Sequence, residues 1–427
     1  MTKTISGFSK LNKQQKIDWL ISNFLSDNPN AETTLEQYWN SNKKLQQLHD
    51  EFIENTISNF YLPYGIAPNF IINGKSYAIP MAIEESSVVA AAALVAKFWS
   101  TRGGFTAEVI STTKIGQVHF MYKGKFDALE KYFNDIKPQL FKATEAITKN
   151  MQKRGGGILD IELKNKTDKL DNYYLLHVTF ETKDSMGANF INSCLEAMAT
   201  AFRKEDIEIV MSILSNYIPD CLVKAQVSCK IEELGKNATI IAQKIYQAVQ
   251  IAQVEPYRAV THNKGIMNGI DAVVIATGND FRAVEAGVHA YAAKSGVYKS
   301  LSNCSIDDGI FKFWIEIPLA LGTVGGLTAL HPMAKLSLEI LQNPSAKELM
   351  QIIAVAGLAQ NFGALKALTT TGIQQGHMKM HLQNILNQLG ASPEEKIELI
   401  KILNHQQITY NSVNKAFHKL RINKLKQ

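Results

Sequence analysis

Cysteine is scarce in this sequence. Four cysteines occur in 427 residues, Cys194, Cys221, Cys229 and Cys304, and no two of them form a C-x-x-C pair. Zinc sites and disulfide frameworks need closely spaced or numerous cysteines, so we expect neither. The pattern indicates reduced thiols in a cytoplasmic protein.

Long hydrophobic runs are also missing. The longest nearly apolar stretch, Val88–Trp99, is interrupted by Lys97 and is too short to cross a bilayer. The first residues, Met1–Ser6, lack the apolar core of a signal peptide. We therefore expect a soluble protein with no membrane partner.

Two signatures of phosphate binding are absent, G-x-G-x-x-G and G-x-x-x-x-G-K-[S/T]. If a nicotinamide cofactor binds, it is not held by a standard Rossmann turn. The net charge of +6 is spread over many short segments, and we expect no nucleic-acid partner. The one basic block, Lys419–Lys426, suits either a solvated surface or an anionic ligand.

The N-terminal quarter of the chain combines helices with one hairpin. Apolar residues at helical spacing predict polar amphipathic helices within residues 10–61, followed by a turn-rich loop at 62–69. Residues 70–80 predict a hairpin with an Asn-Gly turn. An Ala- and Val-rich helix is then expected from Glu84–Ser87 to about Ser100.

Residues 107–215 form a self-contained pattern. The expected elements follow the order β-α-β-β-α-β, which is the ferredoxin-like arrangement. Helices dominate on both sides, so this pattern indicates a small domain inserted into a larger one. The strands are expected at 109–122, 158–163, 173–180 and 207–214, and the helices at 126–150 and 187–202.

The remaining segments complete an α+β fold of several domains, as a chain of this length requires. Helices are expected at 233–253 and 330–370, and strands at 272–276 and 311–317. We predict a large, mostly helical domain from residues 1–108 and 217–375, an inserted domain at 109–216 and a helical C-terminal flap at 376–427.

The segment Asp184-Ser185-Met186-Gly187-Ala188-Asn189 lies between a predicted strand and a predicted helix. The first turn of a helix offers free N–H groups and a positive dipole end, which suit a pyrophosphate. An ordinary helix cap explains the same residues without a ligand. Spacing alone leaves both interpretations open.

Lysine and carboxylate side chains mark a second candidate site. Lys264 lies among amides and glycines, and Asp280 follows later in the chain. A lysine held by a buried carboxylate suits a developing oxyanion, whereas a surface salt bridge is the alternative. Glu85 would need burial or a neighbouring carboxylate to keep a proton near neutral pH. Its alternative role is to stabilise the helix that it precedes.

Two histidines, His377 and His381, stand four residues apart. That spacing can bind a metal, but no H-E-x-x-H motif and no third ligand follows, so we expect no metal site. An exposed polar helix is one explanation of the pair. A histidine that donates a proton from a mobile flap is the other.

Together and in this order, these motifs closely resemble those of hydroxymethylglutaryl-CoA reductase. Because the sequence lacks membrane spans, it resembles the bacterial class II of this family. Thr56, Ser58 and Ser185 replace the usual Val, Gly and Ala, and none of them is assigned to chemistry. The matching stretches are Glu54–Ile57, Pro80–Glu85, Asp184–Asn189, Arg258–Gly265, Ala276–Asp280, Gly322–Gly326 and Gly376–Met378.

The resemblance implies a reaction and an assembly. The reaction is the four-electron reduction of (S)-3-hydroxy-3-methylglutaryl-CoA (HMG-CoA) to mevalonate and free CoA with two NAD(P)H. It runs through a hemithioacetal and mevaldehyde, in the mevalonate pathway of isoprenoid synthesis. The implied assembly is a homodimer with active sites at the subunit interface, in which the inserted domain binds the cofactor.

The resemblance also implies residue roles. Lys264 would stabilise the thioester oxygen, and Asp280 would hydrogen-bond Lys264 and couple it to Glu85. His377 would protonate the CoA thiolate, and Glu85 would give a proton in the second reduction. The substrate would be held by Ser87, Arg258 and Asn268, and the cofactor by Asp184, Met186, Gly187, Ala188, Asn189 and Asn216.

Charge near Gly155-Gly156-Gly157 bears on the cofactor. NADH-specific relatives place an acidic residue upstream of this stretch, whereas this chain has Thr148-Lys149-Asn150 and Lys153-Arg154. Positive charge favours the 2′-phosphate of NADPH. We expect NADPH, with NADH as the alternative.

Two other functions fit part of the sequence. A CoA-acylating aldehyde dehydrogenase would use a cysteine nucleophile, for which Cys194 and Cys229 are the candidates, although neither has a partnering histidine in its motif. A protein that only binds anionic ligands would use the basic surface alone.

Overall fold

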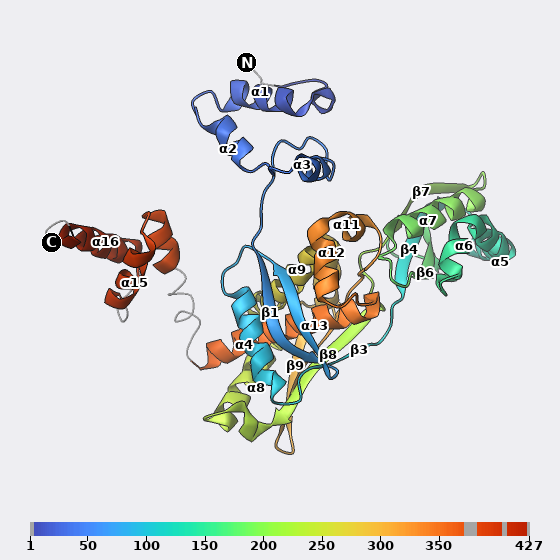
Figure 1. Cartoon of the computed structure of the whole chain (residues 1–427). Helices are drawn as coiled ribbons and strands as arrows, with labels where there is room; N and C mark the ends of the chain where they lie inside the picture. Colours follow the sequence, from blue (N-terminus) through green and yellow to red (C-terminus); the bar gives the residue numbers. More distant parts are fainter. Residues whose placement is uncertain (1–3, 371–381, 404–407, 425–427) are drawn as a thin grey trace. The chain divides into compact units, whose positions relative to one another are not determined.

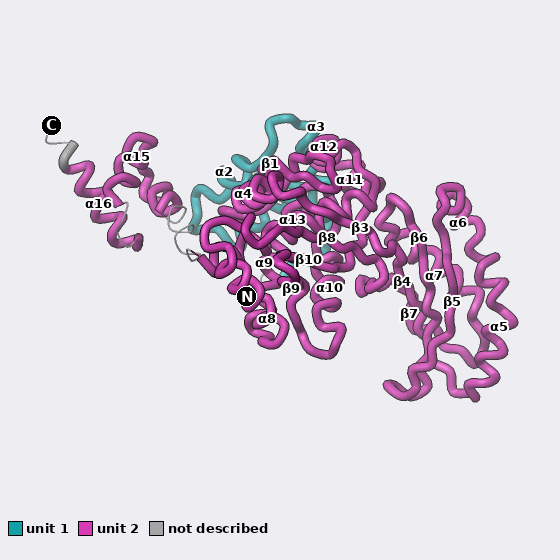
Figure 2. Tube along the Cα trace, turned by 90° about the horizontal axis from the view of Figure 1, so that it is seen from below, with its two compact units in different colours: residues 1–63 teal, residues 64–427 magenta. Residues whose placement is uncertain are grey.

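The computed structural model describes residues 4–370, 382–403 and 408–424. The chain forms two compact units, residues 1–63 and residues 64–427 (Figure 2). His377 and His381 lie outside the described residues, so their predicted roles stay predictions.

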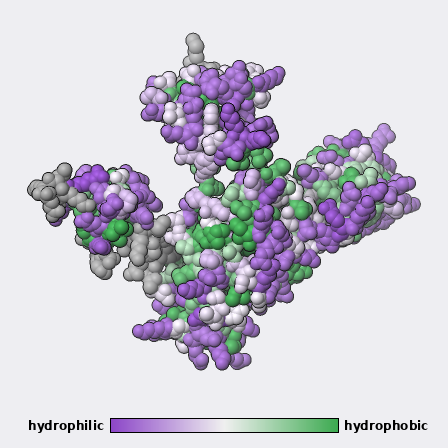
Figure 3. Space-filling view, viewed as in Figure 1, coloured by the Kyte–Doolittle hydropathy of each residue, from purple (hydrophilic) through white to green (hydrophobic). Residues whose placement is uncertain are grey.

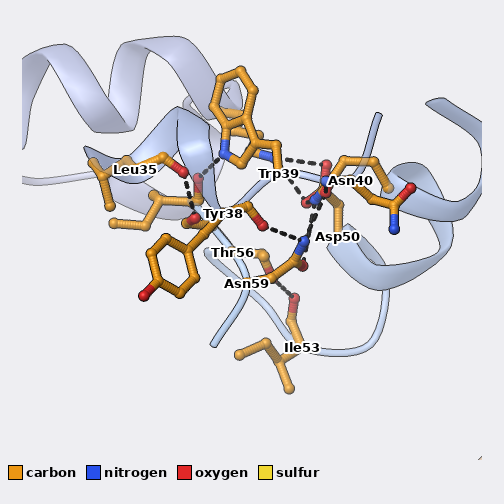
Figure 4. A network of polar contacts seen from close by, with 12 residues as sticks. Leu35, Tyr38, Trp39, Asn40, Asp50, Ile53, Thr56 and Asn59 are labelled. Carbon is orange, nitrogen blue, oxygen red and sulfur yellow. Dashed lines mark hydrogen bonds and ion pairs between the residues drawn. The ribbon is translucent and has the colours of Figure 1, made fainter. Parts of the chain in front are cut away.

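The first unit is helical, as expected, with α1 (Lys13–Phe24), α2 (Ala31–Gln37) and α3 (Lys43–Asp50). Polar contacts hold the segment that follows α3 against the helices (Figure 4). The Trp39 indole donates to the carbonyl of Ile57 at 2.9 Å, and the Asn59 amide donates to the carbonyl of Tyr38 at 2.9 Å. These bonds fix the segment that contains the motif Glu54–Ile57.

The second unit begins with the predicted hairpin, β1 (Tyr64–Ile72) and β2 (Lys75–Ala82), which turns at Asn73-Gly74. The loop expected at 62–69 is wrong from Tyr64 onward, because β1 already pairs with β2 there. Its register shifts between Ala67 and Phe70, so Pro68 and Asn69 form an irregularity within the strand instead of ending it. The predicted Ala- and Val-rich helix follows as α4 (Val88–Ser100).

A four-stranded antiparallel sheet with the order β3-β8-β10-β9 forms the body of the large domain. Its strands are β3 (Thr106–Val109), β8 (Leu222–Lys230), β9 (Ser302–Asp307) and β10 (Ile310–Pro318). The sequence predicted β10 but missed β8 and β9. The strand expected at 109–122 is two strands, because β3 pairs with β8 whereas β4 (Lys114–Tyr122) belongs to another sheet.

The inserted domain has the predicted ferredoxin-like topology, with the antiparallel strand order β5-β6-β4-β7 (Figure 1). The expected helix at 126–150 is divided at Thr144 into α5 (Phe126–Ala143) and α6 (Glu145–Gln152). The other elements are β5 (Gly157–Asn165), β6 (Tyr173–Glu181), α7 (Ala188–Phe202) and β7 (Ile207–Leu214). Its hydrophobic core is separate from that of the large domain.

Helices complete the large domain, namely α8 (Ala238–Val254), α9 (Pro256–Ala276), α10 (Phe281–Ala292), α11 (Gly326–Leu330), α12 (Pro332–Ile340) and α13 (Ala346–Thr369). The strand predicted at 272–276 is wrong, since these residues end α9. Val273 and Val274 are buried there, and a helix end that is buried on most sides shows the same continuous apolar run as a buried strand.

Helix α13 is the core helix of this domain. It is long and apolar enough to cross a membrane by length and composition, but 67% of its most apolar window is buried inside the fold. That burial is typical of the core of a soluble protein.

The C-terminal helices α15 (Pro393–Ile402) and α16 (Tyr410–Lys424) have a small hydrophobic core of their own. The large domain, the inserted domain and the C-terminal helices each have a separate core, whereas residues 1–63, which the sequence analysis placed in the large domain, form a compact unit of their own. The domain division made from the sequence stays a prediction.

Close packing of α9 on α13 gives a test of the fold. A Cβ atom on Gly269 would lie 2.4 Å from the backbone oxygen of Ala356, which cannot move without shifting α13. We therefore expect Gly269→Ala to lower the free energy of unfolding by about 1–3 kcal/mol, measured by urea denaturation.

The matched control lies one turn earlier in the same helix. A Cβ on Gly265 meets no atom within 4 Å, so Gly265→Ala should raise the free energy of unfolding by up to ~1 kcal/mol through helix propensity. Equal effects of the two substitutions would contradict the close contact between α9 and α13.

Candidate active site

Lys264 and Glu85 form an ion pair. Lys264 lies on α9, and its Nζ is 2.5 Å from Oε2 of Glu85, which precedes α4. Asn268, one turn further along α9, donates to the same oxygen at 3.3 Å. The two charged side chains remain 59% and 36% exposed, so a ligand can reach the pair. The structure thus brings together three of the predicted site residues from distant parts of the sequence.

Ser87 stands two residues after Glu85 in an uncommon backbone conformation. Its φ of 76° lies in the left-handed region, and its side chain makes no capping hydrogen bond to α4. A non-glycine residue held in this region stores strain that persists only where the surroundings impose it. The backbone therefore leaves the Ser87 hydroxyl, two residues after Glu85, unused as a cap of α4.

Asp280 does not join this pair within one chain, and its expected hydrogen bond to Lys264 stays a prediction. Twelve residues of α9 separate Lys264 from Ala276, a distance of about 18 Å along the helix axis. Asp280 instead caps α10, where it accepts from the backbone N–H of Arg282 and Ala283. The Arg282 guanidinium also donates to it at 3.0 Å and lowers the pKa of its carboxyl.

Arg258 shares α9 with Lys264 but lies on another face. Arg258 and Lys264 are six residues apart on α9. Their side chains are therefore about 240° apart around the helix and about 9 Å apart along its axis. Half-burial of the guanidinium lowers the pKa of Arg258. Within one chain, Arg258 is therefore not brought to the Lys264–Glu85 pair.

The predicted anion-binding segment lies where the sequence analysis expected it. Strand β6 ends at Glu181 and α7 begins at Ala188, with Gly187 as the N-cap residue at φ 91°. A Cβ on Gly187 would lie 2.6 Å from Cγ2 of Thr182, so this turn requires glycine. The turn leads into α7, a helix of about four turns, and lies close to Gly322 of the large domain.

A small apolar pocket adjoins this turn. Met186, Ala188 and Asn216 line one part of it, and these three were predicted to hold the cofactor. Ala283 and Gly287 of α10 line another part. Because Asp280 begins α10, it stands one turn away from this pocket.

Asp184 has a structural role that the sequence analysis missed. Its side chain accepts from the backbone N–H of Ala346 at 2.8 Å and so caps α13, while its carbonyl accepts from Thr323 at 2.9 Å. The nearby N–H of Gly322 donates to the Asn279 side chain at 2.8 Å. These bonds anchor the turn before α7 to the large domain and explain why the Gly322–Gly326 motif lies there.

Basic side chains gather beside the same turn. A Cβ on Gly155 would lie 3.4 Å from Cε of Lys183, which places the loop carrying Lys153 and Arg154 next to the end of β6. The cluster suits an anionic group that extends beyond the helix terminus.

The cysteines do not fit a nucleophile. Burial raises the pKa of Cys194 and Cys304 to about 12, and that of Cys221 and Cys229 to about 11. A thiolate is the reactive form, so these buried thiols are inert near neutral pH. The geometry therefore argues against the cysteine-dependent dehydrogenase.

Metal ligands do not cluster in the part of the chain that the structure describes, where no group of three or more His, Cys, Asp and Glu could hold an ion.

Comparison with known proteins gives consistent results. The family model for hydroxymethylglutaryl-coenzyme A reductase matches residues 15–382. The 3-hydroxy-3-methylglutaryl-coenzyme A reductase of Archaeoglobus fulgidus is 40% identical over 361 residues, which cover 83% of this chain and 81% of that protein. The probable reductase of Borreliella burgdorferi is 38% identical over 387 residues, 88% of each chain.

Solved structures agree with the sequence relatives. The 3-hydroxy-3-methylglutaryl-coenzyme A reductase of Streptococcus pneumoniae has a TM-score of 0.74 at 37% identity, covering 97% of this chain and 100% of that one. A class II enzyme of that organism, bound to NADPH in open conformations, has a TM-score of 0.73 at 38% identity, covering 86% and 100%. The chain therefore belongs to the hydroxymethylglutaryl-coenzyme A reductase family, as its motifs indicated.

Proposed function

We propose that the Lys264–Glu85 pair is the reacting centre at which this chain performs the reaction of its family, the reduction of HMG-CoA to mevalonate and CoA. The observation that carries this proposal is the 2.5 Å contact between Lys264 Nζ and Glu85 Oε2 on an accessible surface. An ammonium group held by a carboxylate remains charged and oriented, which suits an oxygen that gains negative charge.

In the first reduction, Lys264 stabilises the oxygen of the thioester carbonyl as it becomes the hemithioacetal oxyanion. NADPH supplies one hydride to each of the two reductions when it is bound. His377 then protonates the CoA thiolate as the carbon–sulfur bond breaks, because a thiol with a pKa near 8.5 is within reach of an imidazolium.

In the second reduction, Glu85 first takes up a proton from the solvent that reaches it and then gives this proton to the oxygen of mevaldehyde, while Lys264 again faces that oxygen. Ser87 and Asn268 lie beside the pair and orient the hydroxymethylglutaryl group. Because Arg258 of the same chain lies on another face of α9, we assign to Arg258 of a second copy the two parallel hydrogen bonds that bind the free carboxylate. The C-terminal flap opens between the two steps so that the cofactor can exchange.

Removal of the Lys264 ammonium tests the reacting centre. We expect Lys264→Ala to lower kcat by at least about 100-fold, as the loss of an oxyanion donor does. Lys244→Ala, a matched change at an exposed position of α8, should leave kcat unchanged. A protein that only binds anions would not oxidise NADPH with HMG-CoA even as the wild type. A loss of kcat in Lys264→Ala of less than tenfold contradicts the proposed role of Lys264.

We also propose a homodimer in the cytoplasm whose active sites form between subunits. Tyr257 and Val260 share the face of α9 that carries Lys264, and both are exposed, Tyr257 by 90%. Leu94 on α4 is also exposed. In the unit of residues 64–427, hydrophobic surface gathers over the part that contains α4 and β1 (Figure 3). Exposed apolar residues of this kind mark an interaction site. A second copy would cover them and bring its Asp280 to Lys264.

Mixed dimers test this arrangement. Lys264→Ala and Asp280→Asn dimers should each be inactive, but a dimer with one copy of each variant contains one intact site if the two residues come from different subunits. Random mixing in equal amounts should restore about one quarter of the wild-type activity. No recovery, in a sample whose subunit exchange is verified by two affinity tags, would place Lys264 and Asp280 of each site in the same chain.

We assign cofactor binding to the turn before α7. The N-terminus of α7 attracts the pyrophosphate, and Met186, Ala188 and Asn216 surround the adjoining pocket. Gly187 and Asn189 complete the turn, and Asp184 anchors it. Lys153, Arg154 and Lys183 favour the 2′-phosphate of NADPH over the ribose hydroxyls of NADH.

The cofactor assignment predicts a clear kinetic preference. We expect kcat/KM for NADPH to exceed that for NADH, and the double substitution Lys153→Glu with Arg154→Glu to reduce or reverse this ratio through repulsion of the 2′-phosphate. Steady-state kinetics with both cofactors measure this ratio of kcat/KM values. A wild-type preference for NADH would overturn the choice of cofactor but not the reaction.

A further inference from the structure

Lys114 is a buried lysine that the mechanism above does not use. It begins β4, and its side chain is only 4% exposed. The residues of β4 alternate between the two faces of the sheet, so Lys114 shares the inward face with Gly116, Val118 and Phe120. Lysine is almost never fully buried without a reason.

The ammonium group of Lys114 holds the turn before α7. It donates to the Thr182 hydroxyl and, at 3.1 Å, to the carbonyl of Ser185. The Thr182 hydroxyl donates to the same carbonyl at 2.6 Å. One buried cation therefore fixes the peptide that leads directly into Met186 and the N-terminus of α7.

The charge of Lys114 lacks a direct counter-ion. Among the described residues, no carboxylate lies within 4.0 Å of its Nζ, and burial lowers the pKa of Lys114 while Cys221, Glu181 and Asp184 act against that effect. Both carboxylates near it are engaged elsewhere. Glu181 accepts from the Thr112 hydroxyl at 2.5 Å and from the N–H of Lys183, and Asp184 caps α13.

The other surroundings of Lys114 are uncharged. The pocket that it lines is formed by α7, α10 and the segments around Asn216 and Ala320, and none of their lining residues is ionisable. The Cys221 thiol donates to the carbonyl of Leu319, and burial raises its pKa to about 11. A buried cation beside an apolar pocket and a helix N-terminus is a site that an anionic ligand would complete.

We propose that Lys114 is a positioning residue of the cofactor site, whose buried charge and hydrogen bonds hold the turn before α7 in the conformation that binds the pyrophosphate of the nicotinamide dinucleotide. This inference rests on the proposed assignment of that turn to NADPH. Lys114 acts through the Ser185 peptide and through its electric field, and the reacting atoms do not touch it.

Binding of NADPH alone tests the proposal. Titration of the full chain, followed by NADPH fluorescence, should give a Kd for Lys114→Met at least about tenfold higher than for the wild type, as the loss of a charged hydrogen bond does. The kcat at saturating NADPH and HMG-CoA should stay within about twofold, because Lys114 does not contact the substrate. Lys123→Met, an exposed position just beyond the far end of β4, should bind NADPH like the wild type.

The pH dependence separates an electrostatic role from a merely structural one. The charged form of Lys114 favours the anion, so the Kd of the wild type should rise at alkaline pH as Lys114 loses its proton. Lys114→Arg keeps its charge over this range and should lose the alkaline rise. Cys221→Ala should retain it, which excludes the neighbouring thiol as its cause.

The outcomes are distinguishable. A wild type that does not bind NADPH overturns the cofactor assignment itself. A wild type that binds NADPH with a Kd independent of alkaline pH, or a Lys114→Met variant with an unchanged Kd, overturns the role of Lys114 alone. If Lys114→Met does not fold, the profiles of the wild type and of Lys114→Arg decide the question.

Discussion

The packing of α9 against α13 is the constraint on which the site depends. Gly269 allows the backbone of α13 to approach so closely that no larger residue fits, and the buried side of α9 leaves only one face open. Lys264 and Asn268 lie on that open face, where Glu85 meets them. The C-terminal end of the same helix leads to Asp280 and α10, which borders the pocket that we assign to the cofactor. One rigid helix thus relates both candidate sites.

The exposed ion pair of Lys264 and Glu85 matters little for the stability of the fold. A surface salt bridge contributes roughly 0–1 kcal/mol to stability, so Lys264 and Glu85 add little to the fold. In the proposed function their value is chemical, because the pair brings a cation and a group that can carry a proton to one oxygen. The opposite arrangement occurs at the turn before α7. There, a buried lysine without a carboxylate at ion-pair distance is costly for the protein alone and becomes favourable when an anion binds.

Sequence patterns correctly predicted the elements that depend on residues close together in the chain. Alternation and helical periodicity identified the ferredoxin-like domain, and the Asn-Gly turn identified the first hairpin. The same rules failed at the end of α9, where burial on most sides removes the periodicity. They also failed where contacts are distant in sequence. No spacing rule shows that Asp184 caps α13, because the Ala346 N–H that it accepts from lies 162 residues further along the chain. The sequence analysis did not single out Lys114, although β4 alternation places it on the same face as Val118 and Phe120.

The central claim is that one ion pair serves two successive reductions of the same acyl group. The most direct measurement is the ratio of NADPH oxidised to CoA released with HMG-CoA as substrate, followed by nicotinamide absorbance and a thiol reagent. The account predicts a ratio of about two, with mevalonate as the product. A ratio of about one, with mevaldehyde accumulating in solution, would contradict it.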